Sequence, residues 1–248
     1  MTCNKCVALW RRGKRGLGRY GARGVLKFVI STSLESLRRR FGKGVAEGEG
    51  ELFDRQHQID TTVKPHDAAD LMGVDSENWV HGIAYMPSEP ERFHSLMRHL
   101  PIRFEDYTFI DYGSGKGRAI LMAANYPFKE IMGVEYSSYL HEIAEQNIAH
   151  HVGPTKKCEK IRSIRCDAAQ FAIPAGQVVH YFANPFDEPV MKQVARNIID
   201  SLQREPCRLF VVYYNAVCAN VFLEHGFLEV TRQMDKHGVH LILECSRS

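Results

Sequence analysis

From residue 106 onward, short runs of apolar residues alternate with longer stretches in which apolar positions recur every three or four residues. The short runs have the length and the branched and aromatic content of buried strands, and the longer stretches have the period of amphipathic helices. We expect strands at 107–112, 130–135, 161–166, 177–183 and 208–214. Helices are expected after the first, second, fourth and fifth of these strands. This alternation is typical of a parallel sheet with crossover helices.

The last two apolar stretches, FLEVTRQM and VHLILECS, flank a short turn at residues 236–238 and predict a terminal hairpin. The expected fold is therefore α/β: a doubly wound, mostly parallel sheet of seven strands with a C-terminal antiparallel hairpin. A further helix, opened by Ser88, is expected before the first strand. Its apolar positions recur at helical steps and are expected in the core: Phe93, Leu96, Met97 and Leu100.

Charge divides the chain into two unequal parts. Residues 1–44 hold twelve Lys or Arg against one acid, Glu35, and so carry +11, while the rest of the chain carries −8. Within this basic extension, residues 11–24 show no hydrophobic period, and residues 25–41 predict an amphipathic helix. The sequence GKGVAEGEG then predicts a flexible linker. We therefore divide the chain into a basic N-terminal extension with its linker (1–50), a pre-domain segment with a capping helix (51–105) and a ligand-binding domain (106–248).

Three glycines at every second position, Gly113, Gly115 and Gly117, follow the first predicted strand. They do not form the phosphate loop of nucleotide hydrolases, because Lys116 precedes the last glycine and no Ser or Thr follows it. A dinucleotide-binding turn would need one residue more between the glycines. The stretch instead predicts a sharp strand-to-helix turn whose bare backbone lies against a ligand. Because Asp111 precedes the turn, we expect that end of the ligand to be cationic or amine-bearing.

The second predicted strand ends in Glu135, 24 residues after Asp111. An acid at the carboxyl end of this strand can accept hydrogen bonds from both hydroxyls of a ribose, which indicates an adenosine-type ligand. The alternative is a solvated glutamate at a strand end.

Residues 83–245 resemble the class I, seven-strand, Rossmann-like S-adenosylmethionine-dependent methyltransferases. The resemblance is carried by FIDYGSGKGR, GVEYS, IRCDAAQF and HYFANPFD, and it is closest to uncharacterised bacterial members with a GSGKGR turn and an NPF loop. It implies that Asp111 and the glycine turn hold the amino-acid end of S-adenosyl-L-methionine, Glu135 the ribose, and Asp167 with the Ala168 backbone the adenine. The residues implied in cofactor binding are Asp111, Gly113, Ser114, Gly115, Gly117, Glu135, Asp167, Ala168 and Asn184. Tyr112 departs from the small or aliphatic residue common at its position.

The fourth predicted strand ends in Asn184-Pro185-Phe186, which resembles the (Asp/Asn)-Pro-Pro-(Tyr/Phe) loop of amino-group methyltransferases but is one proline short. By that resemblance, Asn184 accepts a hydrogen bond from an amine and Phe186 packs on a flat or cationic acceptor. Tyr85, in a Y-x-P stretch like that of related lysine methyltransferases, is a third candidate for the catalytic site. The alternative for the NPF loop is a turn that merely ends a strand.

We therefore expect an S-adenosylmethionine-dependent methyltransferase that acts on a nitrogen, in a protein lysine or a small amine. Two alternatives stay open: a nucleic-acid methyltransferase whose basic arm, residues 1–44, holds phosphates, and a non-catalytic cofactor-binding scaffold. The same arm would also suit an acidic protein or a membrane surface.

Other sequence features narrow the expected location and chemistry. No uninterrupted apolar run approaches the ~20 residues of a membrane-spanning helix, so we expect a soluble, cytoplasmic protein. Only Cys3 and Cys6 of the seven cysteines have C-x-x-C spacing, without a second pair to complete a zinc site, and free thiols are expected. We expect no metal: Asp54, His57 and Asp60 are assigned to a solvated linker, and His150-His151 to the end of a helix.

Overall fold

The computed structural model of the 248-residue chain describes residues 49–63, 86–151, 155–236 and 238–246. The basic extension with its predicted helix at 25–41 lies outside these residues, as do Cys3, Cys6 and Tyr85.

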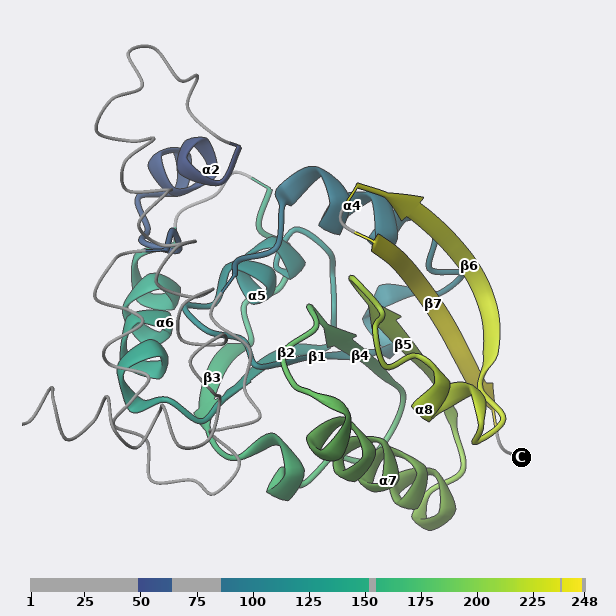
Figure 1. The fold of residues 1–248 in the computed structure, drawn as a ribbon. Helices are drawn as coiled ribbons and strands as arrows, with labels where there is room; N and C mark the ends of the chain where they lie inside the picture. The colour runs from purple at the N-terminus through teal and green to yellow at the C-terminus, as the bar shows by residue number, and fades with distance from the viewer. Residues whose placement is uncertain (1–48, 64–85, 152–154, 237, 247–248) are drawn as a thin grey trace, which may run out of the picture. The chain divides into compact units, whose positions relative to one another are not determined.

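A seven-stranded sheet forms the centre of the described structure, with strand order β3-β2-β1-β4-β5-β7-β6 (Figure 1). The strands are β1 (Thr108–Tyr112), β2 (Glu130–Glu135), β3 (Ile161–Arg165), β4 (Val178–Phe182), β5 (Arg208–Tyr213), β6 (Leu228–Asp235) and β7 (Gly238–Ser246). The pairings among β1 to β5 are parallel, whereas β7 is antiparallel to both β5 and β6. This confirms the predicted mostly parallel sheet with its C-terminal hairpin.

Helices cover both faces of the sheet, as expected for a doubly wound fold (Figure 1). The α-helices are α2 (Glu49–His57), α4 (Pro90–Arg98), α5 (Arg118–Ala123), α6 (Ser138–His150), α7 (Glu188–Arg204) and α8 (Asn220–Leu223). Two 3-10 helices, η3 (Phe104–Asp106) and η4 (Ala168–Gln170), complete the described elements, and η4 takes the place of a crossover helix after β3. None of the described helices is long and apolar enough to cross a membrane.

Two apolar layers hold these helices to the sheet. On one face, α4 and α5 contribute Phe93 and Ile120 to a cluster with Phe109 of β1. On the other face, α7 contributes an apolar stripe that packs against β4 and β5: Val190, Met191, Val194, Ala195, Ile198, Ile199 and Leu202. Burial at this scale supplies the main driving force for folding.

The helix before β1 begins later than the sequence predicts. The α4 helix starts at Pro90 with Glu89 as its N-cap residue, and the hydroxyl of Ser88 instead forms a 2.8 Å hydrogen bond with the Tyr181 hydroxyl of β4. The predicted core residues of this helix are nevertheless buried: Phe93, Leu96, Met97 and Leu100. Ser88 therefore anchors the chain to the sheet rather than capping the helix.

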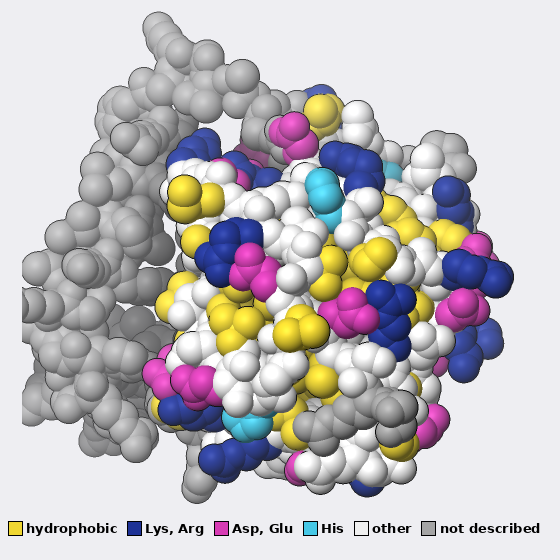
Figure 2. Space-filling view, turned by 90° about the vertical axis from the view of Figure 1, so that its right-hand side faces the viewer, with side chains coloured by type: hydrophobic (Ala, Val, Ile, Leu, Met, Phe, Trp, Pro, Cys, Tyr) yellow, Lys and Arg dark blue, Asp and Glu magenta, His cyan; other side chains and the backbone are white. Residues whose placement is uncertain are grey.

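The surface on the β6 side of the sheet is a mixture of charged and hydrophobic side chains (Figure 2). Figure 2, which looks onto this side, shows charged side chains of both signs among the hydrophobic ones. The β6 residues Glu229 and Arg232 form an ion pair there. Such mixed charge is one way in which natural edge strands avoid pairing with other chains.

Candidate functional site

The glycine turn connects β1 to α5 at the carboxyl edge of the sheet. Gly113, Gly115 and Gly117 have φ values of +74°, +54° and +90°, a conformation that residues with a Cβ adopt only with strain. The amides of Gly113 and Ser114 donate to the carbonyl of Val134, at 2.9 and 3.1 Å, and so fix the turn over the end of β2. The predicted sharp strand-to-helix turn is therefore present.

The loop after β4 packs directly on this turn. A Cβ placed on Gly113 would lie 2.5 Å from the Cβ of Pro185 and 3.7 Å from a ring carbon of Phe186. A real Cβ cannot approach another carbon so closely, so the contact between the turn and the NPF loop depends on glycine at position 113. The two segments that the sequence assigns to cofactor and acceptor thus touch each other.

Two buried acids stand beside the turn. Asp111 and Glu135 are each 3% exposed, on the adjacent strands β1 and β2. The Glu135 carboxylate accepts hydrogen bonds from the amides of Gly115 (2.9 Å) and Ser137 (2.8 Å), which partly offset the rise in its pKa caused by burial. The backbone of Tyr136 bonds to the same carboxylate. Because a carboxylate offers about four lone-pair sites, three such bonds leave it some acceptor capacity.

Asp111 has no such donors among the described residues. Burial, with the Glu135 carboxylate as a second cause, raises the pKa of Asp111 to about 8. A buried carboxylate next to a second acid is stabilised in its ionised form by a cation. The amine end of S-adenosylmethionine is such a group, and the residues at this position therefore fit it.

The loop after β3 brings further polar groups to the same edge of the sheet as Asp111 and Glu135. The amide of Cys166 donates to the carbonyl of Glu135 at 3.0 Å, so the loop after β3 lies beside the end of β2. Asp167 caps η4 by accepting from the Ala169 amide at 2.9 Å, and Ala168 is buried. Along the carboxyl edge, the strand order places Asp167, Glu135, Asp111 and Asn184 in this sequence.

The predicted acceptor residues differ in their surroundings. Asn184 is partly buried and has a left-handed backbone with φ +51°. Phe186 is 6% exposed and belongs to the apolar cluster between the sheet and α7, so its ring packs in the core of the described structure. Contact of that ring with an acceptor stays a prediction, as does the role of Tyr85, which is not described.

Tyr112 and Ser114, two further residues of the FIDYGSGKGR stretch, have buried side chains. Tyr112 lies on the α7 side of the sheet, where its hydroxyl is 3.1 Å from Nδ1 of His180 and its ring stacks on Phe182 at 4.8 Å. The large side chain of Tyr112 is therefore accommodated in the apolar core. The hydroxyl of Ser114 is buried against Gly133 of β2, whose missing Cβ would lie 2.6 Å from it.

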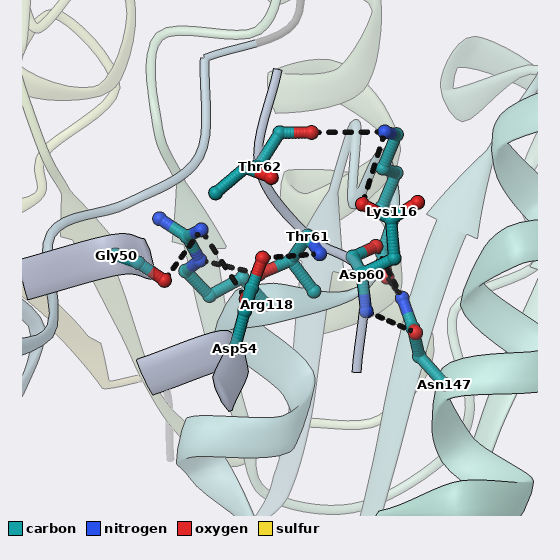
Figure 3. Close-up of polar contacts among 8 residues, drawn as sticks. All are labelled: Gly50, Asp54, Asp60, Thr61, Thr62, Lys116, Arg118 and Asn147. Carbon is teal, nitrogen blue, oxygen red and sulfur yellow. Dashed lines mark hydrogen bonds and ion pairs between the residues drawn. The ribbon is translucent and has the colours of Figure 1, made fainter. Parts of the chain in front are cut away.

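The expectation of a solvated linker around Asp54 is wrong. Asp54 is 7% exposed and Thr61 is fully buried, and both contact Arg118, the first residue of α5 (Figure 3). Sequence reasoning missed these contacts, although a signal was available. Arg118 opens a short helix in which every residue is buried, and a buried cation requires a partner acid.

No described group of three or more potential ligands could hold a metal ion. His57 instead contacts the ring of His151, with centroids 5.1 Å apart, and Nδ1 of His150 lies 2.7 Å from the Gln146 carbonyl at the end of α6. Burial, with smaller effects from His57 and Lys156, lowers the pKa of His151 to about 4. These histidines therefore serve packing and the helix end in the described structure.

Comparisons with known proteins identify similar folds only. No family model matches the chain, and no curated protein matches it. Among solved structures, it is similar to the ribosomal protein L11 methylase of Lactobacillus delbrueckii subsp. bulgaricus, with TM-score 0.44, 13% identity, and 62% of this chain and 76% of that chain covered. It is also similar to the precorrin-6y C5,15-methyltransferase of Geobacter metallireducens GS-15, with TM-score 0.47, 12% identity, and 67% and 93% covered. TrmN from Thermus thermophilus gives TM-score 0.46 and 13% identity, with 65% of this chain and 49% of that chain covered.

Proposed function

We propose that this chain is an S-adenosylmethionine-dependent methyltransferase that acts on a nitrogen acceptor in a protein or a small amine. One observation carries the proposal: the carboxyl edge presents Asp167, Glu135, Asp111 and Asn184 in spatial order. This order matches adenine, ribose, amino-acid end and acceptor, one group per strand. Ligands of open α/β sheets bind at this edge.

The cofactor, when bound, would supply a methyl group on a sulfonium centre for in-line displacement. Asp111 would hold the ammonium of its amino-acid end, and the backbone of the glycine turn would let that end lie close to β1. Glu135 would accept from the ribose hydroxyls with the acceptor capacity that the amides of Gly115, Tyr136 and Ser137 leave open. Asp167 and the Ala168 backbone would border the adenine.

The acceptor would enter beside the NPF loop. The amide oxygen of Asn184 accepts a hydrogen bond from an N–H, and this orients the nitrogen lone pair of the acceptor. Because Pro185 packs on Gly113, the NPF loop that carries Asn184 is in direct contact with the glycine turn. Holding acceptor and donor in fixed geometry is the main catalytic task for a displacement of this kind.

A nucleic-acid acceptor is the second candidate. The charge of +11 in residues 1–44 favours it, because arginine-rich arms neutralise phosphates. The remaining −8 lies on the part of the chain that holds the site, and this favours the amine acceptor. A scaffold that binds the cofactor without turnover is the third outcome that an assay must separate.

Calorimetric titration with S-adenosylmethionine and with its demethylated product tests the cofactor. We expect micromolar binding of both, typical of metabolite sites. Glu135→Ala should weaken binding by about 1 to 3 kcal/mol, because it removes a charged acceptor from two hydroxyls. Absence of both heat and thermal shift for either ligand would overturn the proposal.

Transfer of a labelled methyl group then tests turnover and acceptor class. The assay uses a lysate fractionated into protein, RNA, DNA and small molecules. Label in the protein or small-amine fraction is expected. Label in RNA or DNA selects the second candidate, and binding without label in any fraction selects the scaffold.

A further inference from the structure

The two basic residues of the glycine turn do not face the open edge of the sheet. Lys116 is fully buried and Arg118 is 4% exposed, and they lie on either side of Gly117. Figure 3 shows both side chains directed at the segment from Gly50 to Thr62, which lies more than fifty residues earlier in the chain. This segment, residues 50–62, is called the docking segment below.

Arg118 holds the docking segment at three points. Its Nε donates to the Thr61 hydroxyl at 2.6 Å, and its Nη2 lies 3.4 Å from a carboxylate oxygen of Asp54 and 3.3 Å from the carbonyl of Gly50. Asp54 also accepts from the amide of Thr61 at 2.8 Å and from its hydroxyl. The Asp54 carboxylate thus links the helical part of the docking segment to Thr61 near its end, and also balances the charge of the buried Arg118 guanidinium.

Lys116 and Asn147 provide a second attachment. The ammonium of Lys116 donates to the carbonyl of Thr62 at 2.9 Å and lies 3.7 Å from a carboxylate oxygen of Asp60. The side-chain amide of Asn147, on α6, donates to the carbonyls of Lys116 and Asp60, each at 2.8 Å. Its oxygen accepts from the Asp60 amide at 2.9 Å. The turn, α6 and the docking segment are therefore joined through one buried side chain.

The residue before Lys116, Gly115, connects the same turn to Glu135 at the end of β2. The amide of Gly115 donates to Glu135, while the carbonyl and ammonium of the next residue, Lys116, are held by Asn147 and the docking segment. Undocking would remove from two buried cations the oxygens of the docking segment that they contact, and loss of partner oxygens around a buried charge is destabilising. The turn would relax to rehydrate them, and Gly115 would shift with it.

We infer that the docking segment is a positioning element of the cofactor site, and that Asp54, Arg118 and Lys116 couple its docking to cofactor binding. The inference rests on the proposed function, because it assumes that S-adenosylmethionine binds against the glycine turn. Coupling between two equilibria is reciprocal. Docking therefore favours the ligand-binding form of the turn, and the cofactor in turn strengthens docking.

The reciprocal effect is measured on the unmodified full chain by amide hydrogen exchange. Addition of saturating S-adenosylmethionine should slow exchange in peptides that cover residues 51–58, at least threefold. The outer strand β6 serves as the internal reference and should exchange at an unchanged rate. This measurement needs no variant and so stays decisive if a variant fails to fold.

Calorimetry on variants measures the other direction. Asp54→Asn and Arg118→Lys should each weaken cofactor binding about tenfold, at a temperature at which all proteins are fully folded. Glu244→Gln is the matched control. It breaks the Arg208–Glu244 ion pair (2.6 Å) between the start of β5 and the end of β7, which lies at the amino ends of the parallel strands and not at their carboxyl edge. It should leave the affinity within twofold of wild type, whatever its effect on melting temperature.

The outcomes separate the two hypotheses. If wild type binds the cofactor but exchange at 51–58 is unchanged, or if the Asp54 and Arg118 variants bind as tightly as wild type, the inference is wrong and the proposed function stands. If wild type does not bind the cofactor at all, both are wrong. A tenfold loss in the control as well would show a general effect of stability and would also overturn the inference.

Discussion

Asp111 is the residue whose chemistry depends most on its surroundings. Its raised pKa of about 8 means that the folded protein binds a proton there at neutral pH, which an unfolded chain, with its ordinary aspartate, would have lost. The contribution of this group to stability therefore decreases as pH rises from about 4 to about 8. A bound cationic ligand would instead favour the ionised form of Asp111, because it stabilises the carboxylate.

Cofactor binding should therefore release a proton from Asp111. Between pH 6 and 7.5, where the ligand amine is protonated, we expect affinity to rise as pH rises, by up to about tenfold per unit. Titrations at pH 6.5 in two buffers of different ionisation enthalpy should give a release of about one proton. Asp111→Asn should bind more weakly and lose this release, and a wild-type titration without proton release would contradict the assignment of Asp111.

Asn184 should be needed for methyl transfer and contribute little to cofactor binding. Removal of its side chain deletes an interaction made mainly in the reacting complex, so turnover should fall roughly ten- to a thousandfold at nearly unchanged cofactor affinity. Its left-handed backbone, φ +51°, means that Asn184→Ala also introduces strain. Asn184→Gly removes the side chain without that strain and is the cleaner variant, while Asn184→Asp keeps an acceptor and should be milder. Full activity in a stable Asn184→Gly protein would end the argument for a nitrogen acceptor.

At the scale of elements, the contact between the glycine turn and the NPF loop is the feature most sensitive to one methyl group. Gly113→Ala combines a left-handed backbone with a carbon 2.5 Å from Pro185, so the loop must move. We expect loss of stability by more than the roughly 1–2 kcal/mol of left-handed strain, together with weaker cofactor binding. Gly176→Ala is the matched control, because Gly176 has φ +96° but nothing within 4 Å of the added carbon. Equal losses in the two variants, by chemical denaturation and calorimetry, would show that the packing contact has no role.

The strands β1, β2, β4 and β5 could be predicted closely because a short apolar run is enough to indicate a buried strand. The predicted 130–135 coincides with β2, and the other predicted strands lie within one residue of those observed. The docking segment could not be predicted in this way, because its acids are buried by pairing with cations distant in sequence rather than by any period. Ser88 shows the same limit: the pattern identifies a hydroxyl near a helix start, but the partner, Tyr181, is brought there by the fold. The positions of Asp111 and Glu135 could be predicted because Glu135 ends β2 and Asp111 is the penultimate residue of β1. The packing of Phe186 follows instead from how α7 covers the sheet.

For the whole molecule, charge is distributed unevenly along the chain. The net charge of +3 conceals an extension of +11 and a remainder of −8. The mixed charges on the β6 side in Figure 2 agree with a domain that has no strong field of one sign on that face. Attraction to a polyanion would then depend on the extension, which lies outside the described residues.

A chain that lacks residues 1–24 should therefore keep its cofactor affinity and lose its binding to polyanions. The deletion removes seven of the twelve basic residues but leaves the docking segment, the glycine turn and the acids of the edge intact. Binding of full-length protein to a duplex RNA and to heparin should weaken steeply with salt, because each neutralised phosphate or sulfate releases counterions. The truncated chain should show little affinity and a shallow salt slope. A full-length variant with these seven residues changed to Gln is the matched control, since it keeps the length and removes only charge, and it should behave like the truncation. If the truncation abolished cofactor binding while the Gln variant kept it, the extension would be part of the fold of the site rather than an arm for recruitment.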